Sequence, residues 1–203
     1  MKSTNLPIFQ VDAFTDIPFK GNPAAVVLLE QDADPVWMQN VAREMNLSET
    51  AFVSPRGDDF HLRWFTPAAE VELCGHATLA SAHTLWESRR VPDDKTIRFF
   101  TLSGWLSATK KQDLVELDFP AAGTIPGEIT EEVIHAVGLV PESYWISGDK
   151  WLFEYLHEKE VRMLKPDFAE LKKISGRGLI VTSRSETPDF DFISRYFRAV
   201  IDQ

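Results

Sequence analysis

The sequence is poor in cysteine and in positive charge, and each shortage excludes a class of protein. Its 203 residues include one cysteine, Cys74. A disulfide within one chain needs two sulfurs and a multi-cysteine zinc site needs several, so both are excluded. The 21 basic and 31 acidic residues give a formal net charge of −10. This charge disfavours nucleic acid as a partner, because phosphate backbones attract clustered positive charge.

Long hydrophobic runs are also missing. No apolar run reaches the roughly 18 residues that a membrane-spanning helix needs. Residues 1–7 are polar and lack the apolar stretch of a secretory signal. We therefore expect a cytoplasmic protein with no membrane partner. Hydrophobic residues make up 44% of the chain and charged residues 26%, a globular balance that suits one large domain or two smaller lobes.

Turn residues and hydrophobic spacing predict short strands interspersed with helices. Asp34 followed by Pro35 is a helix-start signal and predicts a helix over 35–45. Thr130 should open another helix that ends at Gly138, and Asp167 should cap a third. Strands are predicted at 8–14 and 24–29, as an opening hairpin, and at 51–54, 60–65, 96–100, 106–110, 114–119, 144–147, 151–156, 179–182 and 190–197.

A further helix, predicted over 76–88, is apolar almost all round. Such a helix is expected to be enclosed by a sheet, so we place it at the centre of a first lobe over 1–119. Pro120 to Gly123 interrupts the pattern like a linker. The part over 120–203 has strands and peripheral helices but no second helix of this kind, which predicts a partial second lobe. The apolar helix positions are Ala77, Leu79, Ala80, Ala82, Leu85 and Trp86.

The segment Leu73 to Thr78, at the start of this helix, carries the strongest candidate chemistry. Unpaired backbone N–H groups there, at Gly75, Ala77 and Thr78, would attract a substrate carboxylate or phosphate. A thiol at this position tends toward a lowered pKa, and His76 could cap the helix, donate to an oxyanion or relay a proton. The alternative is that Cys74 is a small buried hydrophobe and His76 a capping residue.

Two other segments offer polar groups in turns. Glu49 sits between a helix and an apolar strand, where burial would raise its pKa and suit it to carry a proton, although a solvated turn glutamate is the alternative. Asn22, in the turn Gly21 to Pro23, could present its amide to a substrate or simply form the turn. A metal site is not expected, because nothing near Cys74 and His76 in the sequence supplies further ligands.

Four motifs in order closely resemble the PhzF-like family, named for phenazine biosynthesis. They are Phe14-Thr15 with Gly21 to Val27, Asn46 to Val53, Arg63 to Pro67, and Glu70-Val71 followed by Leu73 to Ala80. The resemblance is dense over 8–88, looser over 96–119, and visible again over 190–197. The four motifs share their order with the family, which makes the resemblance specific.

The resemblance implies an α+β fold of the diaminopimelate epimerase type. Two pseudo-symmetric lobes would each wrap a mostly antiparallel sheet around a central helix, with the site in the cleft between them. It also implies an isomerase without metal or coenzyme. In this isomerase Glu49 moves a proton within a small carboxylated substrate, His76 assists, and Cys74, which matches one of two opposed cysteines in related epimerases, has a supporting role.

One departure from the family concerns the segment after residue 197. The family would continue with Asp-Pro-Val-Thr-Gly-Ser-Ala-His and a second central helix, where this chain reads Arg198 to Gln203. This predicts a truncated second lobe. Three functions follow as hypotheses: an isomerase, a truncated and inactive protein that self-associates, and a thiol hydrolase built on Cys74 and His76. The third ranks last, since adjacent helix-start side chains rarely meet and no orienting residue is evident. A homodimer is expected.

Overall fold

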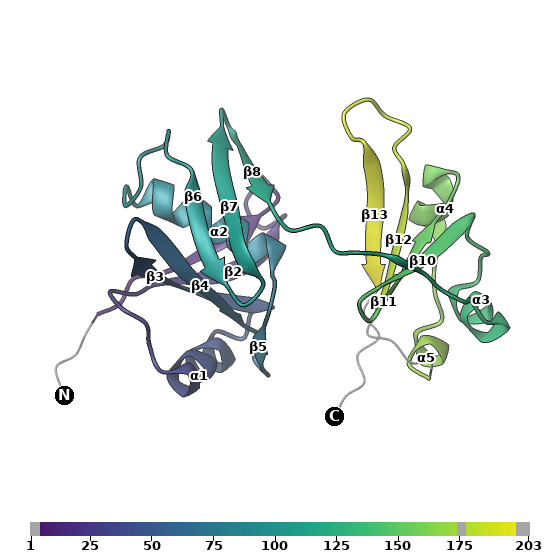
Figure 1. Cartoon of the computed structure of the whole chain (residues 1–203), viewed down its shortest axis with the longest axis horizontal. Coiled ribbons are helices and arrows are strands. Elements are labelled where there is room, and N and C mark those ends of the chain that lie inside the picture. Colours follow the sequence, from purple (N-terminus) through teal and green to yellow (C-terminus); the bar gives the residue numbers. More distant parts are fainter. Residues whose placement is uncertain (1–4, 174–177, 198–203) are drawn as a thin grey trace. The chain divides into compact units, whose positions relative to one another are not determined.

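The computed structural model describes residues 5–173 and 178–197, and it divides into two compact units, 1–120 and 121–203. The fold mixes helices with two separate sheets (Figure 1), as the predicted α+β class requires. Among the residues described, no helix is both long and apolar enough to cross a membrane.

The first unit is built on an eight-stranded sheet with the order β1-β2-β3-β4-β6-β7-β8, with β5 also pairing with β4. The pairs β2/β3 and β4/β6 are parallel and the other pairs are antiparallel. The strands are β1 (Ile8–Ala13), β2 (Asn22–Leu28), β3 (Glu49–Arg56), β4 (Asp59–Phe65), β5 (Glu70–Val71), β6 (Ile97–Thr101), β7 (Gly104–Lys111) and β8 (Leu114–Asp118).

Two helices cover opposite faces of this sheet. Helix α1 (Pro35–Met45) begins as predicted, with the Asp34 carboxylate accepting from two backbone N–H groups. Side chains alternate along a strand, so Ala51 and Val53 of β3 pack in the core that contains α2, whereas Phe52 packs in the core that contains α1. The sheet therefore separates two hydrophobic layers.

Helix α2 (Gly75–Glu87) is the predicted apolar helix, and it starts one residue earlier than the sequence pattern predicts. It contacts β1, β2, β3 and β8, and most of its residues are buried. Its buried hydroxyls at Thr78, Ser81 and Thr84 each donate to the carbonyl four residues earlier, at 2.6 to 2.8 Å. The helix can be enclosed because its small residues admit the strands and these polar groups are satisfied internally.

The second unit has a five-stranded sheet of order β13-β12-β11-β10-β9, in which β11 and β12 are parallel and the other pairs antiparallel. Its helices pack on one face of this sheet, around the fully buried Phe153 and Val181. The elements are β9 (Ile125–Pro126), α3 (Glu131–Val137), β10 (Ser143–Ser147), β11 (Lys150–Glu154), α4 (Glu158–Met163), α5 (Phe168–Leu171), β12 (Gly178–Arg184) and β13 (Phe192–Phe197).

The two units repeat one pattern of strand pairing. In each unit, four successive strands form three pairs, of which the first and third are antiparallel and the second is parallel. Helices lie in the sequence between the second and third strand. The first unit has β1 to β4 with α1 between β2 and β3, and the second has β10 to β13 with α4 and α5 between β11 and β12. In the first unit, β5 and α2 follow this set. The departure from the family motif falls on 198–203, which lie outside the described residues.

Some boundaries differ from the sequence predictions. The strand expected over 190–197 starts at Phe192, and the strand expected over 151–156 ends at Glu154, so that Glu158 can open α4. The sequence does not predict α4, because six residues give too short a periodic pattern. It also misses β5 and β9, because two residues show no alternation.

Candidate active site

Glu49 and its neighbour Ser48 are brought to the entry of β3 by the end of α1. Asn46 ends α1 in a left-handed conformation, with φ 51°, and the chain then enters β3 at Glu49. Glu49 pairs with Ala24 of the parallel strand β2, and the Ser48 hydroxyl donates to the carbonyl of Pro23 at 3.4 Å. The predicted turn over 21–23 therefore lies next to Ser48.

Cys74 and His76 are positioned by the chain that leads into α2. The Arg63 guanidinium makes a two-pronged contact with Glu70, with both N–O distances 2.7 Å. This contact holds β5, which ends at Val71, three residues before Cys74. Cys74 itself is extended, with φ −147°, and is the N-cap residue of α2. Both Cys74 and His76 are buried.

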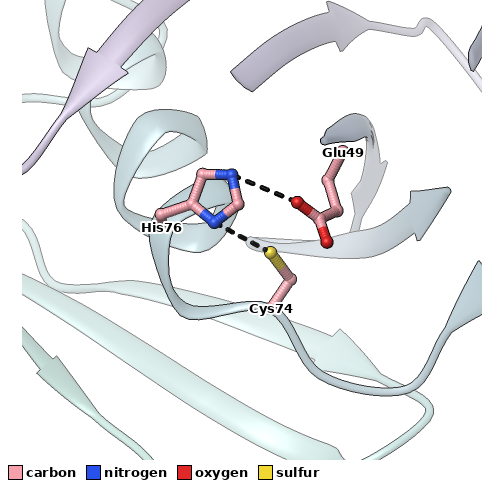
Figure 2. A group of neighbouring side chains, drawn as sticks. All are labelled: Glu49, Cys74 and His76. Carbon is pink, nitrogen blue, oxygen red and sulfur yellow. Dashed lines mark hydrogen bonds and ion pairs between the residues drawn. The ribbon is translucent and has the colours of Figure 1, made fainter. Parts of the chain in front are cut away.

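The three predicted catalytic side chains converge, with Glu49 coming from β3 and the other two from the start of α2 (Figure 2). Glu49 Oε2 lies 3.3 Å from His76 Nε2, and Cys74 Sγ lies 3.4 Å from His76 Nδ1. The hydroxyl of Ser48 is also 3.3 Å from Nε2. The imidazole is thus contacted at both nitrogens.

The predicted low pKa of the Cys74 thiol is wrong. Burial raises its pKa to about 12, and the nearby charge of Glu49 acts in the same direction. The backbone N–H groups of Ala77 and His76 oppose this rise but do not offset it. Burial also lowers the pKa of His76, against the opposing effect of Glu49. These shifts favour a protonated thiol and a neutral imidazole.

Two predictions for the start of α2 are also wrong. His76 does not cap the helix, because the N-cap residue is Cys74. Thr78 does not offer a free N–H group, since both its N–H and its hydroxyl donate to the Cys74 carbonyl. The helix ladder therefore begins at Thr78, and only the N–H groups before it could reach an anion.

The other predicted binding residues differ in exposure. Ala77 is fully buried, whereas Asn22 is exposed at the first position of β2. Gly75 is half-buried at the first position of α2. Sequence reasoning missed Ser48, although it stands in the same motif as Glu49.

The donor atoms of Glu49, Cys74 and His76 all lie within 4.8 Å of one another, so the fold supplies a third possible metal ligand that the sequence does not reveal. The donor set is arranged for hydrogen bonding, however. A bound ion would have to remove the thiol proton, since the metal ligand is the thiolate.

The sequence gives two objections to a thiol hydrolase, that the two side chains would not meet and that no orienting residue is evident, and both are wrong. The side chains of Cys74 and His76 do meet, and Glu49 contacts the second imidazole nitrogen as an orienting group would. The raised pKa of Cys74 is the physical argument against this function, because the nucleophile is the thiolate.

Comparison with known proteins supports the resemblance read from the motifs. The family model described as phenazine biosynthesis-like protein, PhzC-PhzF, matches residues 11–202. An uncharacterized isomerase of Halalkalibacterium halodurans is 48% identical over 192 residues, which cover 94% of this chain and 72% of that protein. A PhzF-family crystal structure from Enterococcus faecalis is 42% identical with a TM-score of 0.84, covering 96% of this chain and 74% of the other.

The fold extends to more distant proteins. A probable proline racemase from Agrobacterium radiobacter superposes with a TM-score of 0.58 at 11% identity, covering 96% of this chain and 71% of the other. This likeness concerns the fold alone, and it confirms the predicted epimerase-like α+β class. Together with this fold, the family model and the close relatives show that the chain belongs to the PhzC/PhzF family of phenazine biosynthesis-like proteins.

Proposed function

We propose that the chain is an isomerase that moves a proton within a small carboxylated substrate, with Glu49 as the proton carrier. The observation that carries the proposal is the contact of 3.3 Å between Glu49 Oε2 and His76 Nε2 at the start of α2, in a chain whose relatives include an uncharacterized isomerase. A carboxylate has about four lone-pair sites on its two oxygens, so the contact of Oε2 with His76 leaves others for a substrate proton.

The proposed reaction uses groups of this chain alone. The substrate carboxylate would dock at the amino end of α2, near the backbone of Gly75, where the helix dipole favours an anion. Glu49 would take a proton from a substrate carbon and become a carboxylic acid. The electron pair of the broken C–H bond would stay on the substrate, which becomes a carbanion. The carboxylic acid, whose proton can exchange with solvent, would then protonate another carbon, which restores the carboxylate.

Proton exchange in heavy water tests this proposal. A panel of small carboxylic acids is incubated with the protein, and deuterium at carbon is measured by mass spectrometry. We expect Glu49→Gln to reduce exchange by roughly 10²- to 10⁴-fold, the usual contribution of a general base. Glu44→Gln, at an exposed position of α1, is the matched control. Exchange that survives Glu49→Gln would refute the role of Glu49.

We also propose self-association as a second function, as a homodimer. On the sheet face of the second unit opposite the helices, the register aligns four partly exposed side chains from four adjacent strands. We call this the apolar row: Trp145, Leu152, Ile180 and Tyr196. Lys150 and Glu154 lie on the same face at either side of Leu152.

A second copy would pack on this face after a rotation of 180° about an axis that runs along the apolar row, across the strands. The rotation reverses the strands, so Lys150 of one copy would face Glu154 of the other while the two rows pack together. Ile180→Asp should then shift the protein toward monomer in analytical ultracentrifugation. Leu114→Asp, at an exposed position of β8, is the control. A wild-type protein that remains monomeric at high concentration would contradict self-association.

A further inference from the structure

His76 is held between partners with different hydrogen-bonding abilities. Glu49 and Ser48 face Nε2, at 3.3 Å each, and Cys74 faces Nδ1 at 3.4 Å. A neutral imidazole donates from one nitrogen and accepts at the other. The identity of these partners therefore bears on which nitrogen carries the proton.

The hydrogen-bonding inventory favours one assignment. The Ser48 hydroxyl donates to the Pro23 carbonyl, so its oxygen is left to accept from Nε2–H. Nδ1 is then an acceptor, and the S–H group of Cys74 is the donor that faces it. Glu49 Oε2, 3.3 Å from the same nitrogen, is compatible with this assignment because a carboxylate oxygen accepts.

We propose that Cys74 and Ser48 are positioning residues that hold His76 as its Nε2–H tautomer, with Nε2 beside Glu49. The thiol acts through the far nitrogen of the ring and touches no reacting atom. Its raised pKa agrees with this role, since a donor must keep its proton. The consequence for proton transfer rests on the proposed function, whereas the tautomer itself does not.

The tautomer can be measured without an activity assay. Long-range ¹H–¹⁵N correlation spectra of the full chain distinguish the two neutral tautomers, and the His76 signal is assigned by its loss in His76→Gln. We expect the Nε2–H pattern in the wild-type protein. An Nδ1–H pattern would overturn the proposal, and this result does not depend on whether any other variant folds.

Three variants then test the two positioning residues. Cys74→Ala and Ser48→Ala should each give mixed tautomers and reduce proton exchange by about three- to tenfold, as for the loss of one neutral hydrogen bond. Cys74→Ser retains a donor and should restore both the tautomer and the rate. His83, exposed on the same helix, is an internal control whose signal should not change.

The outcomes separate this proposal from the proposed function. A wild-type Nε2–H tautomer that is lost in Cys74→Ala supports the positioning role, whatever the exchange rate of Glu49→Gln. Proton exchange that survives Glu49→Gln would refute the proposed isomerase and leave the positioning role standing. An unchanged tautomer in both alanine variants would overturn positioning, whatever the exchange rate shows.

Discussion

The two units share an order of strand pairing but bury their sheets to different extents. In the first unit, α1 covers one face and the enclosed α2 lies against the other. In the second, α3, α4 and α5 all pack on the face of Phe153, and the apolar row lies on the opposite face. Strand pairing alone therefore does not complete a core, because each face of a sheet needs its own cover.

Matched leucine substitutions should lower the free energy of unfolding by very different amounts in the two units, and this is the largest difference that we expect. Leu85 of α2 is 1% exposed, whereas Leu152 in the apolar row is partly exposed. Leu85→Ala should lower the free energy of unfolding of the first unit by about 3 kcal/mol, since it leaves a cavity. In the monomeric protein, Leu152→Ala should cost the second unit less than about 1 kcal/mol, because its site there is already partly hydrated.

Hydrogen exchange during urea unfolding, read separately for each unit, would check this difference. Equal losses from the two substitutions would mean that the face of Leu152 is covered as closely as α2. That result, with a monomeric protein, would contradict the exposed apolar row.

The free energy of unfolding of the second unit should depend on one arginine more strongly than that of the first unit does. Arg195 Nη1 of β13 donates to the carbonyls of Val161, Arg162 and Leu164 at 2.9, 3.2 and 2.7 Å, which joins the strand to the end of α4. Arg195→Ala should destabilise this unit by about 1.5–3 kcal/mol, as expected when hydrogen bonds to a charged group are lost.

Faster amide exchange in α4 and β13, with no change in the first unit, is the expected readout for Arg195→Ala. Arg184→Ala, at the exposed end of β12, provides the control. Uniform acceleration across both units would show that they do not unfold independently.

Acid sensitivity should be the smallest effect, and it is expected in both units. Hydrogen bonds from Ser54 and His61 lower the pKa of Asp32 from its ordinary value. The backbone N–H of Glu186 and the side chain of Arg162 lower the pKa of Glu158 in the same way. A carboxylate with a depressed pKa stabilises the fold above its unfolded pKa, and this contribution is lost as pH falls through the folded value.

Asp32→Asn should therefore cost less than about 1 kcal/mol near neutral pH, because the side chain is largely exposed and solvent screens it. Its stability should also fall less steeply than that of the wild type below about pH 4. Glu158→Gln should behave in the same direction in the second unit. Thermal unfolding followed from about pH 2 to 7 would show an unchanged acid slope if these carboxylates did not contribute.

Much of the fold can be predicted because local signals agree with it. Asp34 and Pro35 begin α1 where the sequence indicates, and Gly138 ends α3 with φ 84°. The apolar character of α2 on nearly every side predicts its enclosure. Short elements such as α4 escape prediction because their contacts, including that of Arg195, come from distant parts of the chain.

The site can be predicted in its members but not in its contacts. Motifs point to Glu49, Cys74 and His76, yet the sequence does not show that two of them face opposite nitrogens of the third. The sequence also predicts the pKa of Cys74 in the wrong direction, because the expected effect of a helix amino terminus is outweighed by burial and by Glu49.

The sequence by itself determined the family, the start of α1, the enclosed helix and the residue types of the site. Those features depend on spacing, capping and side-chain polarity within short stretches of chain. Tertiary structure alone decided the contact of Glu49 with His76, the place of Ser48 beside them and the burial of the thiol. These properties depend on distances between β3 and α2, which strand pairing and packing set and local sequence does not.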